Sequence, residues 1–130
     1  MKKLALSIAA LVVSAGTSLA DPVEGIWKTQ PGDTGGYLHV AVSKCGDAIC
    51  GVIRKAYKQG GVVSEGYEHL GKRMLWDMQA KGDGSYSGGK IWAPDRNKTY
   101  KSKMSLSGNT LKVSGCVAVI CRSQNWTRVK

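Results

Sequence analysis

Residues 98–115 read KTYKSKMSLSGNTLKVSG, and this stretch indicates the fold more clearly than any other. Its first part alternates strictly, as a strand with one inward and one outward face does. The predicted inner face consists of Tyr100, Ser102, Met104 and Leu106, and the outer face of Thr99, Lys101, Lys103 and Ser105. Gly108-Asn109 then closes a tight turn into a second strand, so that the stretch predicts an antiparallel hairpin.

The same alternation, broken by short turns, recurs on both sides of this hairpin. We predict eight strands, over residues 24–29, 37–44, 49–57, 72–79, 85–92, 98–106, 110–115 and 122–129. Eight short strands in simple hairpin order are typical of a small antiparallel up-and-down β-barrel, and a β-sandwich is the main alternative. Only residues 58–71, with Gly60, Gly61 and Gly66, are too long for a hairpin turn and lack alternation.

The first 20 residues have the pattern of a secretory signal. Lys2 and Lys3 precede an apolar run over residues 4–13, and Ser18 and Ala20 are small residues at the cleavage positions. The apolar run is too short to span a bilayer. We therefore expect a signal peptide over residues 1–20, one domain over residues 21–130, a periplasmic or secreted location and no transmembrane segment.

Composition and charge exclude several classes of protein. Residues 21–130 hold 17 basic against 9 acidic residues and 16 glycines, a density that no long helical bundle tolerates. Nucleic acid is not an expected partner, because the chain is exported and lacks an RNA-binding motif. A basic stripe is predicted on the outer wall, at Lys98, Lys101, Lys103 and Lys112. It is either a solvated surface or a contact for an anionic envelope surface.

Four cysteines in an exported chain are interpreted first as two disulfides. Cys45 and Cys50 enclose four residues, as do Cys116 and Cys121. Of the three possible connectivities, the spacing favours these two local pairs, because opposed residues on a hairpin lie close to disulfide distance. A zinc site is the alternative, but its usual spacing is tighter and would require both pairs to converge.

No residue pattern in the sequence indicates catalysis. The two histidines, His39 and His69, belong to no metalloprotease or hydrolase motif, and Asp47, Asp83 and Asp95 occupy predicted turns. We therefore expect a protein that is not an enzyme and has no metal and no cofactor. The sequence predicts no oligomeric state.

Two motifs at the ends of the domain resemble the lipocalin and calycin pattern. Gly25-Ile26-Trp27 opens the first predicted strand, and Trp126-Thr127-Arg128 lies in the last one. In lipocalins a Gly-x-Trp opens the barrel, and its indole packs against an arginine of the final strand. The resemblance implies that Gly25, Trp27, Trp126 and Arg128 lock the closed end of a barrel.

Further motifs resemble a family of small exported bacterial proteins known as domain of unknown function number 2147. They lie, in this order, at residues 45–51, 88–95, 98–100, 111–116 and 126–128. The resemblance covers nearly all of residues 23–129 and implies a lipocalin-like barrel without an established function. Members often carry an Asn-Pro-Asp-rich stretch after the third strand, whereas residues 58–71 here are glycine-rich and lack proline.

A barrel of eight strands either encloses one small ligand or is filled by its own side chains. If a cavity exists, we expect it to be lined by large side chains of the central strands, Met74, Trp76, Trp92, Tyr100 and Met104. The ligand would be small and apolar or amphipathic, such as a fatty acid, with basic residues favouring an anionic head. A filled barrel would instead favour a protein-interaction or envelope-stress module.

Two connections bear on ligand entry. We predict that residues 58–71 cover the entrance, because their glycines allow movement and no other connection is long enough. Val117-Ala118-Val119-Ile120 is apolar where turns are usually polar. We interpret this segment as core at one barrel end, and the alternative is an exposed contact for a membrane or a partner.

Overall fold

The computed structural model describes residues 20–130, so residues 1–19 of the predicted signal lie outside the described range. The described chain consists of nine strands and one short 3-10 helix, η1 (Gln59–Gly61). The strands are β1 (Gly25–Lys28), β2 (Tyr37–Cys45), β3 (Ala48–Lys58), β4 (Val62–Val63), β5 (Arg73–Ala80), β6 (Ser85–Ala93), β7 (Lys98–Ser107), β8 (Thr110–Val117) and β9 (Ile120–Arg128).

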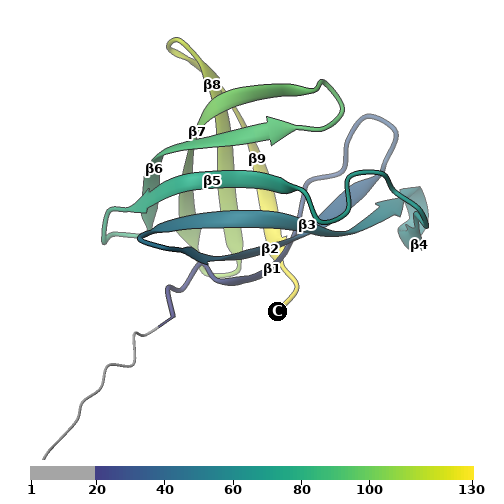
Figure 1. Ribbon diagram of the computed structural model, residues 1–130, viewed down its shortest axis with the longest axis horizontal. Coiled ribbons are helices and arrows are strands. Elements are labelled where there is room, and N and C mark those ends of the chain that lie inside the picture. The colour runs from purple at the N-terminus through teal and green to yellow at the C-terminus, as the bar shows by residue number, and fades with distance from the viewer. Residues whose placement is uncertain (1–19) are drawn as a thin grey trace, which may run out of the picture.

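Eight of these strands close into an antiparallel barrel (Figure 1). Neighbours along the chain pair in the order β1-β2-β3-β5-β6-β7-β8-β9, and β9 returns to β1 through Trp27 opposite Arg128. β4 is a two-residue edge strand that pairs only with the end of β3. The predicted up-and-down barrel is confirmed and the sandwich alternative is wrong, because every barrel strand pairs with two other strands of the barrel.

The up-and-down order places the connections at two opposite ends of the barrel. At one end, which we call the mouth, lie the connections β1–β2, β3–β5, β6–β7 and β8–β9. The chain segment before β1 lies at the other end, the closed end, with the connections β2–β3, β5–β6 and β7–β8. Hydrophobic side chains fill the interior nearest the closed end, and Trp27, Trp126 and Leu111 have no exposed surface.

The segment before β1 plugs the closed end. Trp27 Nε1 donates a hydrogen bond to the Val23 carbonyl oxygen at 2.8 Å, and the Arg128 guanidinium lies 4.4 Å from the centre of the Trp27 ring. Arg128 also donates to the carbonyl oxygens of Pro22 and Glu24, at 2.6 and 3.0 Å. Trp126 is fully buried near the same end, where it pairs with Leu111 close to the β7–β8 turn.

A buried tyrosine ties the same plug to the barrel wall. The Tyr86 hydroxyl donates to the carboxylate of Asp21, which also accepts a hydrogen bond from the Val23 amide. Burial raises the pKa of Tyr86, and the hydrogen bond and charge of Asp21 add to this effect. Tyr86 therefore stays neutral at physiological pH and serves as a donor.

The two local cysteine pairs are present as predicted. Cys45 pairs with Cys50 across the β2–β3 turn, and Cys116 pairs with Cys121 across the β8–β9 turn. In both cases the disulfide closes a hairpin whose strands are already hydrogen-bonded. Two disulfides are consistent with a protein that works outside the cytoplasm. Among residues 20–130, no helix is long and apolar enough to cross a membrane.

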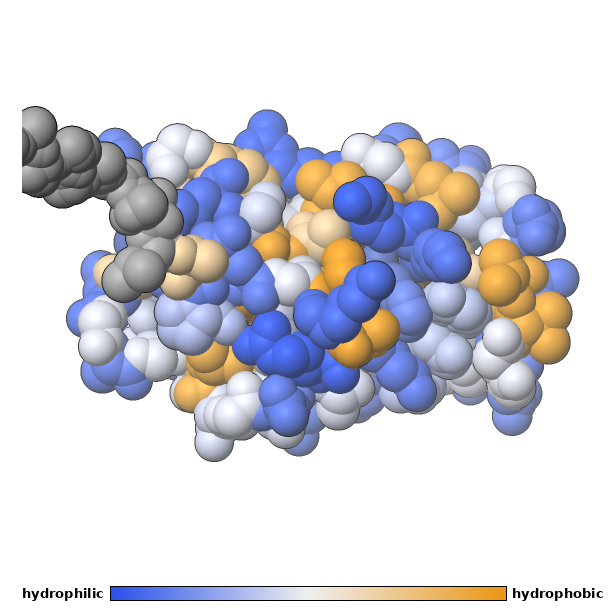
Figure 2. Space-filling view, turned by 90° about the horizontal axis from the view of Figure 1, so that it is seen from below, coloured by the Kyte–Doolittle hydropathy of each residue, from blue (hydrophilic) through white to orange (hydrophobic). Residues whose placement is uncertain are grey.

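The outer wall of the barrel is largely hydrophilic. Seen from below, hydrophobic residues form small groups separated by polar and charged ones (Figure 2). Three lysines of the predicted basic stripe, Lys101, Lys103 and Lys112, are exposed on the outside of β7 and β8. Lys98, at the start of β7, lies instead at the mouth.

Glycine makes one close approach possible inside the wall. A Cβ atom at Gly89 would lie 2.6 Å from the Trp76 carbonyl oxygen and 2.8 Å from the Met78 sulfur. We expect Gly89→Ala to lower the free energy of unfolding by about 1–3 kcal/mol, because the carbonyl is fixed in the sheet. The matched control is Gly115→Ala, whose Cβ would meet its nearest neighbour at 3.4 Å. Urea denaturation compares the two, and equal midpoints would contradict the steric argument.

Candidate functional site

A cup of about 600 Å³ opens at the mouth of the barrel. Its floor is mostly apolar, with Met74 from β5, Ile91 from β6, Tyr100 from β7, and Val113 and Gly115 from β8. The cup exists partly because Gly115 has no side chain: a Cβ there would already touch Tyr100 and Ile91, at 3.4 and 3.5 Å. Below this floor lie the buried residues of the hydrophobic core, so the cup is confined to the part of the barrel near the mouth.

The rim of the cup carries charges of both signs. Arg96, Lys98 and Arg122 are cations at the rim, and Asp33 and Asp95 are carboxylates. All five residues are exposed, so they are available to the head of a molecule whose apolar part lies in the cup. Apolar rim contacts come from Val117 and Ile120 of the β8–β9 hairpin.

Hydrogen bonds fix one side of this rim. The Asn125 amide donates to Gln30 Oε1 at 3.0 Å, which holds the β1–β2 connection against β9. Trp126 Nε1 donates to Gln124 Oε1 at 2.9 Å. Because Gln30 and Gln124 both line the cup, this part of its wall is preformed.

Of the five residues predicted to line a cavity, Met74 and Tyr100 line the cup. Met104 lies deeper in the interior, beside Tyr86 on the paired strand. The assignment of Trp76 to the cavity is wrong, because Trp76 pairs with Lys90 on the outer face and lies 5.9 Å from the Arg73 guanidinium.

Trp92 is also misassigned, and the long connection explains where it lies. Ile91 and Ala93 point into the cup, so Trp92 between them faces the outside. There its ring meets the edge of His69 at 5.0 Å, and its Nε1 donates to Asn97 Oδ1 at 3.0 Å. The tryptophan is thus a docking point for the connection rather than a ligand contact.

The β3–β5 connection does not cover the cup, which corrects the prediction for residues 58–71. None of these residues lines the cup. Instead His69 packs between Trp92 and the Tyr67 ring, 5.3 Å away, and Lys72 lies 5.6 Å from the Trp92 ring. Burial raises the pKa of Tyr67, with smaller contributions from the negative charges of Asp95 and Glu68.

His39, the other histidine, lies on the outer wall. Its ring packs on Tyr57 at 4.6 Å, and Tyr57 stacks on Tyr37 at 4.9 Å. Burial lowers the pKa of His39, and the positive charges of Lys55 and Lys28 lower it further. The histidine is therefore neutral at physiological pH, and it does not line the cup.

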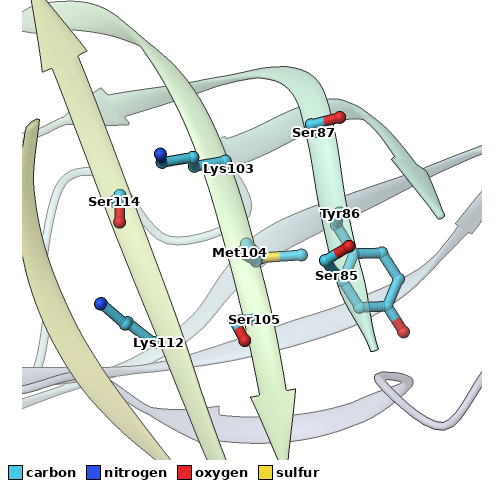
Figure 3. Close-up of a pocket in the computed structure, with 8 residues that line it drawn as sticks. All are labelled: Ser85, Tyr86, Ser87, Lys103, Met104, Ser105, Lys112 and Ser114. Atoms are coloured by element: carbon cyan, nitrogen blue, oxygen red, sulfur yellow. The ribbon is translucent and has the colours of Figure 1, made fainter. Parts of the chain in front are cut away.

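A second hollow, of about 360 Å³, lies where the pairing of β6 and β7 shifts register (Figure 3). Tyr86 and Met104 approach one another there, and serine hydroxyls and two lysines surround them: Ser85, Ser87, Ser105, Ser114, Lys103 and Lys112. We attribute the hollow to the bulge at Ser87-Gly88, which separates the two strands locally.

Among residues 20–130, no three histidine, cysteine, aspartate or glutamate side chains are grouped as ligands of one metal ion. The residues that line the cup include no histidine and no cysteine. Its chemistry is therefore that of an apolar floor with a charged rim.

Comparison with known proteins places these features in a family. The family model described as "Uncharacterized protein conserved in bacteria (DUF2147)" matches residues 25–128. A search of curated proteins found no match. Among solved structures, protein HP1028 from Helicobacter pylori, described as belonging to the lipocalin family, is similar with a TM-score of 0.65 and 16% identity over 83% of each chain. At this identity the likeness shows the fold, which is lipocalin-like.

Proposed function

We propose that the chain, which belongs to the DUF2147 family of bacterial proteins, binds a small amphipathic molecule with an anionic head. The observation that carries the proposal is the cup, whose floor is apolar and whose rim holds three cations. Its volume of about 600 Å³ lies within the range of ligand sites in proteins. A lipocalin-like barrel is compatible with such binding.

The chemistry of the cup favours a carboxylate or phosphate on an acyl chain. An apolar chain gains about 25 cal/mol for each Å² of its surface removed from water. An anionic head at the rim would meet Arg96, Lys98 and Arg122, although Asp33 and Asp95 reduce the net charge there. The excess of basic residues over the whole domain adds a weak long-range attraction.

We propose binding without catalysis, in the periplasm or outside the cell. The lining residues offer no cysteine nucleophile and no histidine base. The location follows from the predicted signal and agrees with the two disulfides. A fatty acid is the simplest test molecule of the proposed class.

Displacement of a fluorescent fatty acid from delipidated protein tests the proposal. We expect lauric acid to bind at one saturable site in the micromolar range, and methyl laurate to bind about tenfold more weakly because it lacks the charge. Arg122→Glu should lower the affinity for lauric acid about tenfold and leave the affinity for methyl laurate nearly unchanged.

The matched control is Lys81→Glu, which makes the same charge change at the closed end. Loss of lauric acid affinity in both variants to the same degree would show that only net charge matters. No saturable displacement by any acyl compound would refute the proposed function.

A further inference from the structure

The turn between β8 and β9 is an exposed apolar projection at the mouth. We call Val117–Ile120 the tip; Val117, Val119 and Ile120 are 62, 94 and 69% exposed. The tip stands out beyond the rest of the barrel in Figure 1. These exposures correct the interpretation of the segment as core. Four consecutive apolar residues at a turn are unusual, because turns in water favour glycine and polar residues.

Most of the large exposed hydrophobic side chains belong to two separate connections at the mouth. In the described part of the chain, seven large hydrophobic residues are exposed: Val62, Val63, Leu70, Val117, Val119, Ile120 and Val129. All except Val129, which follows β9 at the closed end, lie between β3 and β5 or in the β8–β9 hairpin tip. Figure 2 shows hydrophobic residues at its right-hand end, where Figure 1 places β4, whereas the β8–β9 hairpin projects at a separate place in Figure 1. The turns at the closed end are polar, as Gly46-Asp47 and Gly108-Asn109 illustrate.

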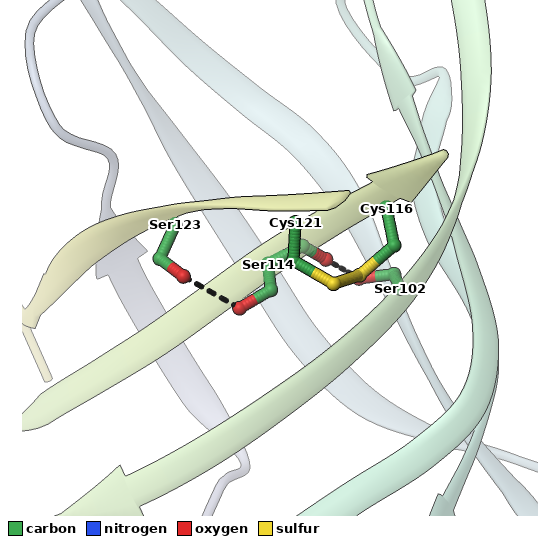
Figure 4. Close-up of a disulfide and its surroundings, with 5 residues drawn as sticks. All are labelled: Ser102, Ser114, Cys116, Cys121 and Ser123. Carbon is green, nitrogen blue, oxygen red and sulfur yellow. Dashed lines mark hydrogen bonds between the residues drawn. A yellow bond between two sulfur atoms is a disulfide. The ribbon is translucent and has the colours of Figure 1, made fainter. Parts of the chain in front are cut away.

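A disulfide and strand pairing constrain the tip. The Cys116–Cys121 disulfide closes its base, and Val117 pairs with Ile120 above it. Just below, Ser114 shares a hydrogen bond with Ser123 at 2.8 Å, and Ser102 donates to the Ser114 carbonyl oxygen at 2.7 Å (Figure 4). A preformed tip loses little conformational entropy when it binds.

The tip also has an unusual backbone for its sequence. Ala118 has a φ of +54°, a region that residues other than glycine and asparagine rarely occupy. The disulfide-closed hairpin holds this alanine where glycine would be the ordinary choice. The sequence therefore keeps a methyl group at the exposed turn despite the conformational cost.

Positive charges surround the base of the tip. Lys101 is opposite Cys116 and Arg122 is opposite Gly115, so both lie within one or two residues of the tip. Arg96 and Lys98, across the cup, add two more cations, against the carboxylates of Asp33 and Asp95. An apolar projection with cations behind it matches a bilayer, where acyl chains lie below a layer of anionic headgroups.

We propose that the tip inserts into the surface of an anionic lipid bilayer and thereby turns the mouth of the cup toward the membrane. This inference goes beyond ligand binding in the cup, and the tip shares Val117, Ile120 and Arg122 with the rim of the cup. A lipid surface fits better than a protein partner, because the apolar area of the tip is small and cations lie behind it.

Co-sedimentation with vesicles tests this docking. The protein is purified after export and its first residue is determined by mass spectrometry, because an uncleaved apolar run at residues 4–13 would bind membranes itself. We expect binding to phosphatidylethanolamine vesicles that contain phosphatidylglycerol, weaker binding to phosphatidylcholine vesicles, and weakening by salt.

Substitutions at Val119 report on insertion without touching the cup, because Val119 does not line it. Val119→Ser should lower the partition coefficient of the protein between vesicles and water about tenfold, whereas Val119→Trp should raise it. The control is Val129→Ser, which makes the same change at an exposed valine at the closed end. For charge, Lys101→Glu should weaken binding more than Lys81→Glu.

The proposal would be overturned by the absence of binding to anionic vesicles, or by binding that Val119→Ser leaves unchanged. If Lys101→Glu and Lys81→Glu lower the affinity for anionic vesicles equally, the whole basic surface is attracted to the vesicles and the tip is not the docking site. Fatty-acid displacement without vesicles distinguishes membrane docking from ligand binding in the cup. In that assay Val119→Ser should bind lauric acid with the affinity of the unsubstituted protein.

Discussion

Trp27→Ala is expected to lower the free energy of unfolding by about 3–5 kcal/mol, the usual cost of truncating a buried tryptophan. The side chain has no exposed surface, so its removal leaves a cavity at the closed end. The substitution also removes the hydrogen bond to the Val23 carbonyl and the ring beneath the Arg128 guanidinium. The plug before β1 thus loses the contacts that Trp27 makes with it.

Arg128→Ala should cost less, about 1–2 kcal/mol, because the arginine is only partly buried. It would lose the cation–π contact and the two hydrogen bonds to the plug, but it would leave Trp27 in place. Urea denaturation followed by far-UV circular dichroism gives both values.

Trp76→Ala is the matched control for the size of the truncation. Trp76 lies on the outer wall and is partly exposed, so its loss leaves no enclosed cavity. A Trp27→Ala variant as stable as Trp76→Ala would show that the plug contributes little, and would contradict the role of Trp27 in closing the barrel.

Alternation made most of the fold predictable from the sequence. The eight predicted strands match eight observed ones to within two residues at each end. The hairpin at residues 98–115 was the clearest case, because Ser102 and Met104 are buried and Lys101 and Lys103 are exposed. The order of short strands joined by turns then left an up-and-down barrel as the simplest closure.

Bulges explain why the cavity residues were less predictable. Strict alternation in β5 puts Met74, Trp76 and Met78 on one face, but the pairing of β5 with β3 shifts register near Leu75. Asp77 then takes a φ of +59°, so Leu75 and Met78 are fully buried while Trp76 faces outward. An aspartate at positive φ has no clear signature in the sequence.

The sequence analysis did not locate the cup, because the cup depends on a missing side chain on the inward face of a strand. The predicted cavity was lined by the largest side chains, whereas the cup forms where Gly115 leaves space beside Ile91 and Tyr100. Gly115 lies opposite Ser102, which the alternation of the hairpin places on the inner face. A glycine at this position was the feature of the sequence that could have indicated the cup. Large rings mark where a barrel is filled, and small residues on the inward face mark where it is hollow.

Gly115→Leu is expected to lower the affinity for lauric acid about 100-fold or more, because it fills the floor of the cup. A Cβ at this position makes ordinary contacts with Tyr100 and Ile91, at 3.4 and 3.5 Å, so the rest of the leucine must extend into the cup. The backbone of Gly115 has no positive φ, so a side chain causes no backbone strain.

Gly115→Ala is the matched control, and it should bind lauric acid within about threefold of the unsubstituted protein, since it adds a single methyl group. Both variants should unfold near the original urea midpoint, which separates loss of the cup from loss of the fold. A folded Gly115→Leu variant that binds lauric acid with undiminished affinity would place the ligand elsewhere on the barrel. The apolar floor and the charged rim would then have to be explained without a ligand between them.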